Sequence, residues 1–229
     1  MNRTFVIGDI HGAYHALRQC MDRALFDYED DTLICLGDVC DGWPHTNACI
    51  GDLLKVKNLI YVLGNHDWWT LEWMTSGYKD STWFSQGGEA TVNSYPEGVP
   101  ESHKALLRNA QTYYILKNKL FVHAGFDPNR PIEMQGIQVF LWDRHLARTA
   151  FDFYQKHVDG NLTMYDEVYL GHTPIPYKHP IKACDIWLMD TGAGWSGVLS
   201  IMNIDTKEIF TSDEVPTLYP GVKGRSRNK

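Results

Sequence analysis

The stretch TFVIGDIHG, residues 4–12, decides the fold of this chain. Its apolar run Thr4–Ile7 is typical of a short buried strand, and that strand ends in Gly8 and Asp9. Apolar side chains then recur at helical spacing over residues 13–25, which predicts an amphipathic helix of about three turns. The order of strand, glycine turn and helix is typical of α/β proteins.

The same order repeats along the chain. Strands are predicted at Thr32–Leu36 and Leu59–Leu63 with a helix over residues 46–55 between them, so the start of the chain favours a partly parallel sheet. Residues 68–116 are less regular and indicate a helical, cap-like insertion with a loop at Gly87 and Gly88. Later strands are predicted at Tyr113–Leu116, Lys119–Val122, Glu167–Leu170, Ile186–Met189 and Val198–Ile204, with the last pairing with Glu208–Thr211 as a hairpin.

Composition restricts the classes of function. The chain has 229 residues, 44% of them apolar, and suits a single domain over residues 1–215. Its formal charge of −7 argues against general nucleic-acid or membrane-surface binding, which normally needs a basic face. Basic residues gather in the last seven positions, so residues 216–229 are predicted to be a flexible basic tail, exposed from about residue 213.

Two further features predict a cytoplasmic protein with no membrane segment. The five cysteines are odd in number and form no C-x-x-C pair, which favours neither a disulfide framework nor a zinc knuckle. No apolar run approaches the ~20 residues that span a bilayer.

Four predicted strands end in one recurring pattern, an apolar pair followed by glycine and a potential metal ligand. A single Gly-Asp or Gly-Asn pair is ordinary turn chemistry, but four repeats with varied ligand types point to a metal site. A fifth strand places a histidine just before Ala124 and Gly125. The ligands that follow the five strands are Asp9, Asp38, Asn65, His172 and, on the fifth, His123.

Strand carboxyl ends in an open α/β sheet meet at one crevice, so these side chains are expected to converge there. His11 joins them because residues i and i+2 of an extended segment point the same way. Carboxylate, amide and imidazole donors without thiolate favour Mn²⁺, with Fe or Zn²⁺ as alternatives. Six ligands are too many for one catalytic ion and suit two ions that share a bridging carboxylate.

With these motifs in place, the chain resembles the calcineurin-like metallophosphoesterases, and within them the phosphoprotein phosphatase family. Residues 8–12, 37–41 and 64–67 resemble the blocks G-D-x-H-G, G-D-x-x-D-R-G and G-N-H-E/D. The resemblance extends to about Gly197 and is strongest to small phage and bacterial phosphatases and to symmetric diadenosine tetraphosphatases. It implies an α/β/β/α sandwich of central mixed sheets flanked by helices, with the active site at the strand carboxyl ends.

The resemblance also implies roles for individual residues. One metal would be held by Asp9, His11 and Asp38, and Asp38 would bridge to a second metal held by Asn65, His123 and His172. His66 would give a proton to the leaving group and Asp41 would orient it, while Arg144 and Asn65 would hold the substrate phosphate. These roles agree with the chemistry of hydrolysis, because a metal-activated water attacks the phosphorus and the leaving oxygen needs a proton donor.

The chain departs from the family mainly in the second block, where Cys40 also replaces the usual valine, while Asp67 in place of glutamate in the third block is a mild change. The second block normally continues Asp-Arg-Gly, whereas here it reads Asp41, Gly42 and Trp43, so an arginine that helps hold phosphate is missing. Five of the eight tryptophans lie in or after these blocks, and they favour a packed helical cap over a wall that stacks on a base, except Trp43, which lies beside the position of the missing arginine. They are Trp43, Trp68, Trp69, Trp73 and Trp83.

The expected activity is hydrolysis of phosphate monoesters, as in serine/threonine protein phosphatases. A symmetric dinucleoside tetraphosphate hydrolase, or another nucleotide phosphatase, stays open as the alternative, and a binding module without catalysis is a third. The partner is then a phosphopeptide or a nucleotide. The acidic balance does not oppose this, because two divalent ions would bring the formal charge from −7 to −3.

Overall fold

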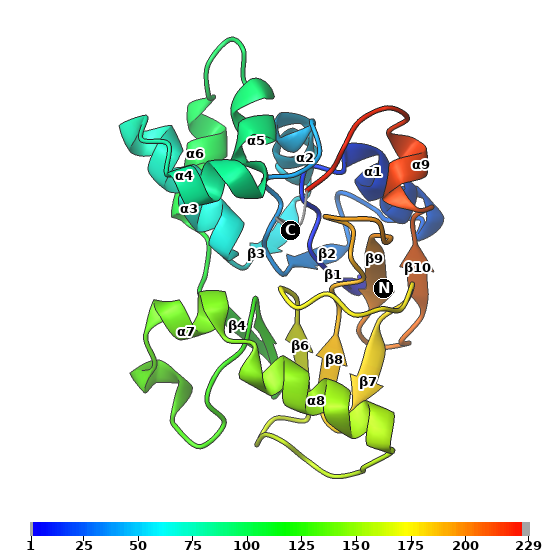
Figure 1. Ribbon diagram of the computed structural model, residues 1–229. Coiled ribbons are helices and arrows are strands. Elements are labelled where there is room, and N and C mark those ends of the chain that lie inside the picture. Colours follow the sequence, from blue (N-terminus) through cyan, green and yellow to red (C-terminus); the bar gives the residue numbers. More distant parts are fainter. Residues whose placement is uncertain (1, 226–229) are drawn as a thin grey trace.

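The structure is a computed structural model that describes residues 2–225, and its frame is two five-stranded sheets stacked between helices (Figure 1). In the first sheet the strand order is β10-β9-β1-β2-β3. The neighbours β1, β2 and β3 pair in parallel, while β9 pairs antiparallel with both β1 and β10. The strands are β1 (Thr4–Ile7), β2 (Thr32–Cys35), β3 (Asn58–Tyr61), β9 (Ser200–Asn203) and β10 (Ile209–Thr211).

The second sheet has the order β4-β5-β6-β8-β7, with a parallel centre and an antiparallel strand at each edge. Its strands are β4 (Tyr113–Leu116), β5 (Lys119–Val122), β6 (Glu167–Leu170), β7 (Ile181–Ala183) and β8 (Ile186–Leu188).

Helices cover the outer face of each sheet. The first sheet is covered by α1 (Tyr14–Arg23), α2 (Thr46–Leu53), α3 (Asn65–Ser76), α6 (Glu101–Arg108) and α9 (Val215–Leu218), and the second by α7 (Ile137–Trp142) and α8 (His145–Lys156). Between α3 and α6 the chain forms α4 (Ser81–Trp83), a π-helical turn (Phe84–Gly88) and α5 (Glu89–Asn93). A 3₁₀ turn spans Ile132–Met134.

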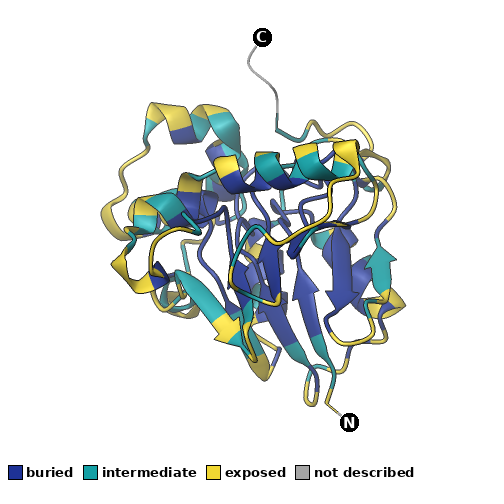
Figure 2. Cartoon of the chain, turned by 90° about the horizontal axis from the view of Figure 1, so that it is seen from below, coloured by how far each residue is buried: buried dark blue, intermediate teal, exposed yellow. Residues whose placement is uncertain are grey.

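Alternating side chains along the strands build three apolar layers. In β1, Phe5 and Ile7 face the helices of the first sheet, while Val6 faces the second sheet. Between the sheets, Phe121 stacks on Tyr169 with ring centroids 4.6 Å apart. The inner strands are accordingly buried, the edge strands β3, β4 and β10 are partly exposed, and the helices keep one exposed side (Figure 2). The predicted sandwich of two mixed sheets flanked by helices is confirmed.

Several predicted elements differ from the structure. The sequence patterns miss α7 and α8. At the predicted loop, Gln86 and Gly87 leave helical geometry, with φ of 111° at Gly87, and Gly88 begins the turn into α5. The sequence patterns also predict an exposed tail from about residue 213, yet Val215 and Tyr219 are buried because the segment folds back over α1. Of the tail, residues 226–229 lie outside the described residues. No helix in residues 2–225 combines the length and apolar character needed to cross a bilayer.

Candidate metal centre

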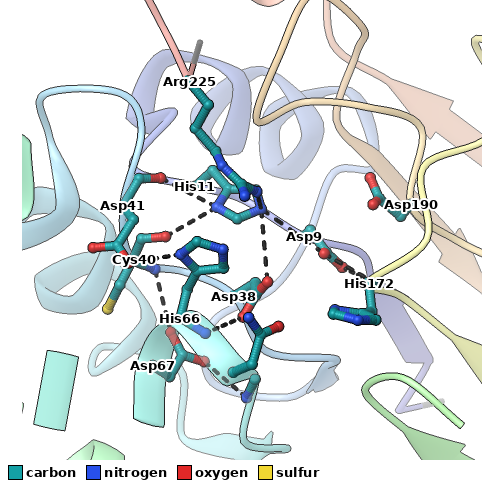
Figure 3. Close-up of polar contacts among 12 residues, drawn as sticks. Asp9, His11, Asp38, Cys40, Asp41, His66, Asp67, His172, Asp190 and Arg225 are labelled. Atoms are coloured by element: carbon teal, nitrogen blue, oxygen red, sulfur yellow. Dashed lines mark hydrogen bonds and ion pairs between the residues drawn. The ribbon is translucent and has the colours of Figure 1, made fainter. Parts of the chain in front are cut away.

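The carboxyl ends of five strands meet at one place, as the sequence pattern predicts. Two sets of three potential ligands form there, and within each set the ligand atoms lie within 4.8 Å of one another. Asp38 belongs to both sets (Figure 3). The sets are Asp9, His11 and Asp38, and Asp38, His123 and His172, and Asn65 adjoins the second with its Oδ1 3.0 Å from His123 Nε2. The structure therefore brings together all six predicted ligands, and all six are buried.

Glycine before a ligand allows this close approach. A Cβ atom at position 64 would lie 2.2 Å from Asp38 Oδ1, and one at position 171 would lie 2.3 Å from Asp9 Oδ1. Any larger residue at either position would push a carboxylate out of the cluster.

Four site residues have left-handed backbone. The φ angles are 51° at His11, 49° at Asp38, 71° at Asp41 and 62° at His172. Non-glycine residues seldom adopt this conformation, and it costs about 1–3 kcal/mol where it occurs. Such strain is typical of residues held by their surroundings for a functional geometry.

Backbone carbonyls fix the tautomers of two histidines. Nδ1 of His11 lies 3.0 Å from the Cys40 carbonyl, and Nδ1 of His123 lies 2.8 Å from the Leu36 carbonyl. Because a carbonyl only accepts, each Nδ1 carries a hydrogen. The Nε2 atoms of both rings lie on the side of the Asp38 carboxylate, at 3.7 and 3.4 Å. Each Nε2 can bind a metal when it carries no proton, which for His123 means loss of the second proton of the imidazolium.

His172 supplies direct support for a metal. Its backbone N–H donates to both carboxylate oxygens of Asp9, at 3.1 and 3.0 Å. Its Nε2 is buried and has no hydrogen-bond partner among the described residues. A buried nitrogen without a partner is costly in a folded protein, and a cation beside it would remove that cost.

The charges in the cluster also fit cations. Five buried carboxyl groups gather here, from Asp9, Asp38, Asp41, Asp67 and Asp190 (Figure 3). Burial, reinforced by Asp190, raises the pKa of Asp9 well above its usual range. Although burial opposes it, the Asp38 carboxylate raises the pKa of His123 to about 9. Divalent ions would replace such retained protons, and the donor set of carboxylate, amide and imidazole suits two of them.

His66 and Asp41 form a pair beside this cluster. His66 Nδ1 lies 2.7 Å from Asp41 Oδ2, so the imidazole is oriented by a carboxylate, as the sequence resemblance implies. Burial lowers the pKa of His66 to about 3 and raises the pKa of Asp41 to about 7. Both shifts disfavour charge on the pair while no anionic ligand is present.

The segment at residues 81–93 holds Asp41, a role that the sequence did not indicate. Trp83 Nε1 donates to Asp41 Oδ2 at 2.7 Å, and the Thr91 hydroxyl donates to Asp41 Oδ1 at the same distance. Thr70 adds a longer contact of 3.4 Å. The cap-like insertion therefore positions a site residue in addition to covering the sheet.

Asp67 links the second and third blocks. Its Oδ1 accepts from the backbone N–H groups of Val39 and Cys40 at 3.0 and 3.2 Å, and its Oδ2 accepts from Gly64 at 3.1 Å. One carboxylate thus ties the loop after β2 to the start of α3. Asp67 lies three residues after Gly64, the N-cap of α3, and this capping-box spacing is the sequence signal that could have revealed the link.

Arg144 lies at the edge of the cluster, between α7 and α8. Its Nη1 donates to the His172 carbonyl at 2.7 Å and contacts the Thr173 hydroxyl at 3.3 Å. It is half-buried, and burial lowers the pKa of its guanidinium. Its backbone contacts hold it near the metal ligands, where it can reach an anion.

The tryptophans separate into two groups. Trp43 and Trp83 are both buried; for Trp83 this agrees with a packed cap, and Trp43, expected to be the exception, is packed as well. Trp69 instead lies against His66, with ring centroids 5.2 Å apart, and contacts Trp142 at 4.9 Å. Trp142 in turn lies 6.2 Å from His172. An aromatic pair therefore flanks the metal centre, with Trp142 partly exposed.

Known proteins align with this chain along most of their length. It is 24% identical to serine/threonine-protein phosphatase 1 of Salmonella typhimurium, over 87% of this chain and 91% of that protein. It is 29% identical to a symmetrical bis(5'-nucleosyl)-tetraphosphatase of Haemophilus ducreyi, over 93% and 99%. A similar enzyme of Neisseria meningitidis is 26% identical, over 90% and 93%.

Among solved structures, a serine/threonine phosphatase from Saccharomyces cerevisiae superposes with a TM-score of 0.63 at 13% identity, covering 97% of this chain and 82% of that one. A metallophosphoesterase from Sphaerobacter thermophilus gives 0.56 at 16%, covering 92% and 87%. Residues 3–197 match the model of the calcineurin-like phosphoesterase family. The predicted family is confirmed: with its buried cluster of Asp and His ligands, this chain belongs to the calcineurin-like phosphoesterases, which are metal-dependent phosphoric ester hydrolases.

Proposed function

We propose that this protein is a dinuclear phosphoesterase whose site cleaves nucleotide substrates, with symmetric dinucleoside tetraphosphates as the leading class. The observation that carries the dinuclear centre is the sharing of Asp38 between two ligand sets. Asp9, His11 and Asp38 would hold one ion, while Asp38, Asn65, His123 and His172 would hold the other. Mn²⁺ is the proposed ion, with Fe or Zn²⁺ as alternatives.

Two bound divalent ions would supply an activated water and neutralise phosphoryl oxygens. The protein's residues do the rest of the work. Arg144 and Asn65 hold the substrate phosphate close to the ions, and His66 gives a proton to the leaving oxygen as the oxygen–phosphorus bond breaks. Asp41 holds the imidazole by its Nδ1–H, and the phosphate anion raises the His66 pKa from the low value that burial imposes.

The aromatic pair Trp69 and Trp142 supports a nucleotide substrate. Aromatic side chains beside a phosphate site offer flat surfaces on which a nucleobase stacks, worth about 1–3 kcal/mol per base. Two of the relatives compared above are symmetrical tetraphosphatases, and each is aligned along nearly its whole length. Symmetric cleavage adds one water across a phosphoanhydride bond and releases two nucleoside diphosphates.

A phosphoprotein phosphatase is the second candidate. The Salmonella relative supports it, because that protein is a serine/threonine phosphatase and aligns over 87% of this chain. A binding module without catalysis is disfavoured by the His66–Asp41 pair, since a scaffold that only binds phosphate does not require an oriented proton donor.

A substrate panel tests the proposal. Metal-free protein is reloaded with Mn²⁺ and offered diadenosine tetraphosphate, a phosphoserine peptide, p-nitrophenyl phosphate and a phosphodiester. We expect the dinucleotide to give the highest kcat/KM. A higher value for the phosphopeptide would reverse the order of the two candidates, and no turnover of any compound by protein shown to hold metal would overturn both.

A matched pair of variants tests the stacking surface. Trp69→Ala should raise KM for the dinucleotide by about tenfold, since one stacked base is lost, and should leave KM for p-nitrophenyl phosphate unchanged. Trp68→Ala is the control, because Trp68 is the exposed neighbour on the same helix. Equal effects of Trp69→Ala on both substrates would contradict base stacking.

A further inference from the structure

The chain after α9 folds back across the mouth of the metal centre. Tyr219 stacks on the buried indole of Trp43, with ring centroids 4.9 Å apart and planes 26° apart. Gly224 lies so close to the same indole that a Cβ there would be 2.6 Å from a ring carbon. The Arg225 backbone N–H then donates to the Gly194 carbonyl at 3.3 Å. Trp43 thus fixes the path of the segment that delivers Arg225.

The Arg225 side chain points into the cluster (Figure 3). Its Nη1 lies 3.1 Å from His11 Nε2, and its Nη2 donates to Gln86 Oε1 at 3.3 Å. Its guanidinium carbon lies 4.5 Å from the ring centroid of Trp195. The Nε–H is buried and has no hydrogen-bond partner among the described residues. A side chain from the end of the chain therefore brings a positive charge and an unused donor to the ligands.

Arg225 lies where a side chain of residue 42 would extend. A Cβ at position 42 would be 2.9 Å from Arg225 Cγ, so only glycine leaves room for it. The φ angle of Gly42 is +109°, a conformation that L side chains rarely adopt. Position 42 is also the point at which the second block of this chain lacks its arginine.

We propose that Arg225 is a phosphate-binding residue of this enzyme, supplied by the end of the chain in place of the arginine that the second block lacks. A planar guanidinium with free N–H groups suits bidentate binding of phosphoryl oxygens, and the Trp195 face and Gln86 orient it in advance. A metal ion at His11 would take the lone pair that Arg225 contacts here and leave Nη1 free for the anion, beside the unused Nε–H.

The positive charge of Arg225 affects the pKa values of several residues of the site. It contributes, after burial, to the low pKa of His11, and it opposes the raised pKa values of Asp41 and Asp190. A positive group placed among these residues increases the attraction for an anionic substrate.

The inference rests on the proposed phosphoesterase activity, but its main test does not need turnover. Inorganic phosphate is titrated into Mn²⁺-loaded protein by calorimetry, for wild type, Arg225→Ala, Arg225→Lys and Lys223→Ala. Lys223 is an exposed tail residue two positions away and controls for the loss of one charge. The metal content of every protein is measured first.

We expect Arg225→Ala to keep both metals and to bind phosphate 10- to 100-fold more weakly, as for the loss of charged hydrogen bonds. The phosphate affinity of Arg225→Lys should lie between those of Arg225→Ala and wild type, because lysine keeps the positive charge but lacks the paired N–H groups of the guanidinium. Lys223→Ala should match wild type. With p-nitrophenyl phosphate, Arg225→Ala should raise KM more than it lowers kcat, and added guanidinium ion should restore part of the loss.

Two results would overturn the inference. Unchanged phosphate affinity in Arg225→Ala would remove the arginine from the binding site. Faster turnover together with tighter Mn²⁺ binding would mean that Arg225 blocks the metal site instead of serving it. If wild-type protein hydrolyses none of the panel but Arg225→Ala still weakens phosphate binding, the proposed activity fails while the inference stands.

Discussion

Strand β6 has a buried carboxylate, Glu167, at its start and the carboxylates of the metal centre beyond its end, and only the first is neutralised by side chains of the protein. At its start, Glu167 accepts hydrogen bonds from Lys119, from Lys207 at 2.5 Å and from the Tyr169 hydroxyl at 2.8 Å, with Lys182 3.6 Å away. Just beyond its end, His172 lies among the carboxylates of the metal centre, and its Nε2 lacks a partner among the described residues.

This difference in charge balance distinguishes a site that stabilises the fold, at Glu167, from one that is suited to bind metal. Around Glu167 the chain supplies its own cations, and although burial opposes it, the lysines lower the pKa of Glu167 to about 2. In the metal centre, burial and the Asp190 carboxylate raise the pKa of Asp9, and although burial opposes it, the Asp38 carboxylate raises the pKa of His123. His172 Nε2 has no hydrogen-bond partner there among the described residues. A cluster that is already neutralised has little affinity for a further cation, whereas one that is not neutralised is ready to bind metal.

The largest effect should come from Asp38→Asn. Because Asp38 belongs to both ligand sets, the variant should lose both metals together and lower kcat/KM by about 10³-fold or more. Metal content by elemental analysis and kinetics on p-nitrophenyl phosphate measure this. Loss of only one metal would contradict the bridging role of Asp38. It would also weaken the contrast between the metal centre and the Glu167 site.

His66→Ala should have a smaller effect of a different kind. Both metals should stay, while kcat falls by about 10²-fold on esters with poor leaving groups, since general acids contribute 10²–10⁴-fold. A good leaving group such as p-nitrophenolate should suffer less. If His66→Ala loses metal, then His66 belongs to the ligand set and its assignment as proton donor is wrong.

Glu167→Gln should have the smallest effect on catalysis. Metal content and kcat/KM should equal those of wild type, while stability at pH 7 falls by about 2 kcal/mol, because the lysines lose their counter-charge. The folded pKa of Glu167 lies below its ordinary value, so its contribution is present above about pH 4.5 and is lost as the pH falls toward 2.

Denaturation of the two proteins across this pH range measures the effect. Their difference in unfolding free energy should shrink steadily below pH 4.5. A constant difference down to pH 3 would show that Glu167 stabilises the fold by packing and not by charge.

The fold and the gathering of the ligands could be predicted from the sequence because both depend on local repetition. Each strand end has its own apolar pair and glycine, and parallel strands place these ends together without further information. Helix α8 could not be found in this way, since its buried face has only Leu146, Ala147 and Ala150. Its position is decided by packing on the second sheet.

The supporting residues could not be predicted for a related reason. Trp83 and Thr91 reach Asp41 from 42 and 50 residues away, and Arg225 reaches His11 from 214 residues away. Contacts at such separations leave no periodic trace in a single sequence. In the sequence Tyr219 and Gly224 look like ordinary tail residues. Only the structure shows that both pack against the indole of Trp43.

The left-handed backbone at His11, Asp38 and His172 also restricts which side chains, and through them which metals, this centre could accept during evolution. Histidine, aspartate and asparagine are the side chains that tolerate such backbone best, and each is also a metal ligand. Glutamate and cysteine could bind metal at these positions, but the chain conformation opposes them. At these three of the six ligand positions, the turns favour oxygen and imidazole donors over thiolate, and so they disfavour the metals that prefer thiolate.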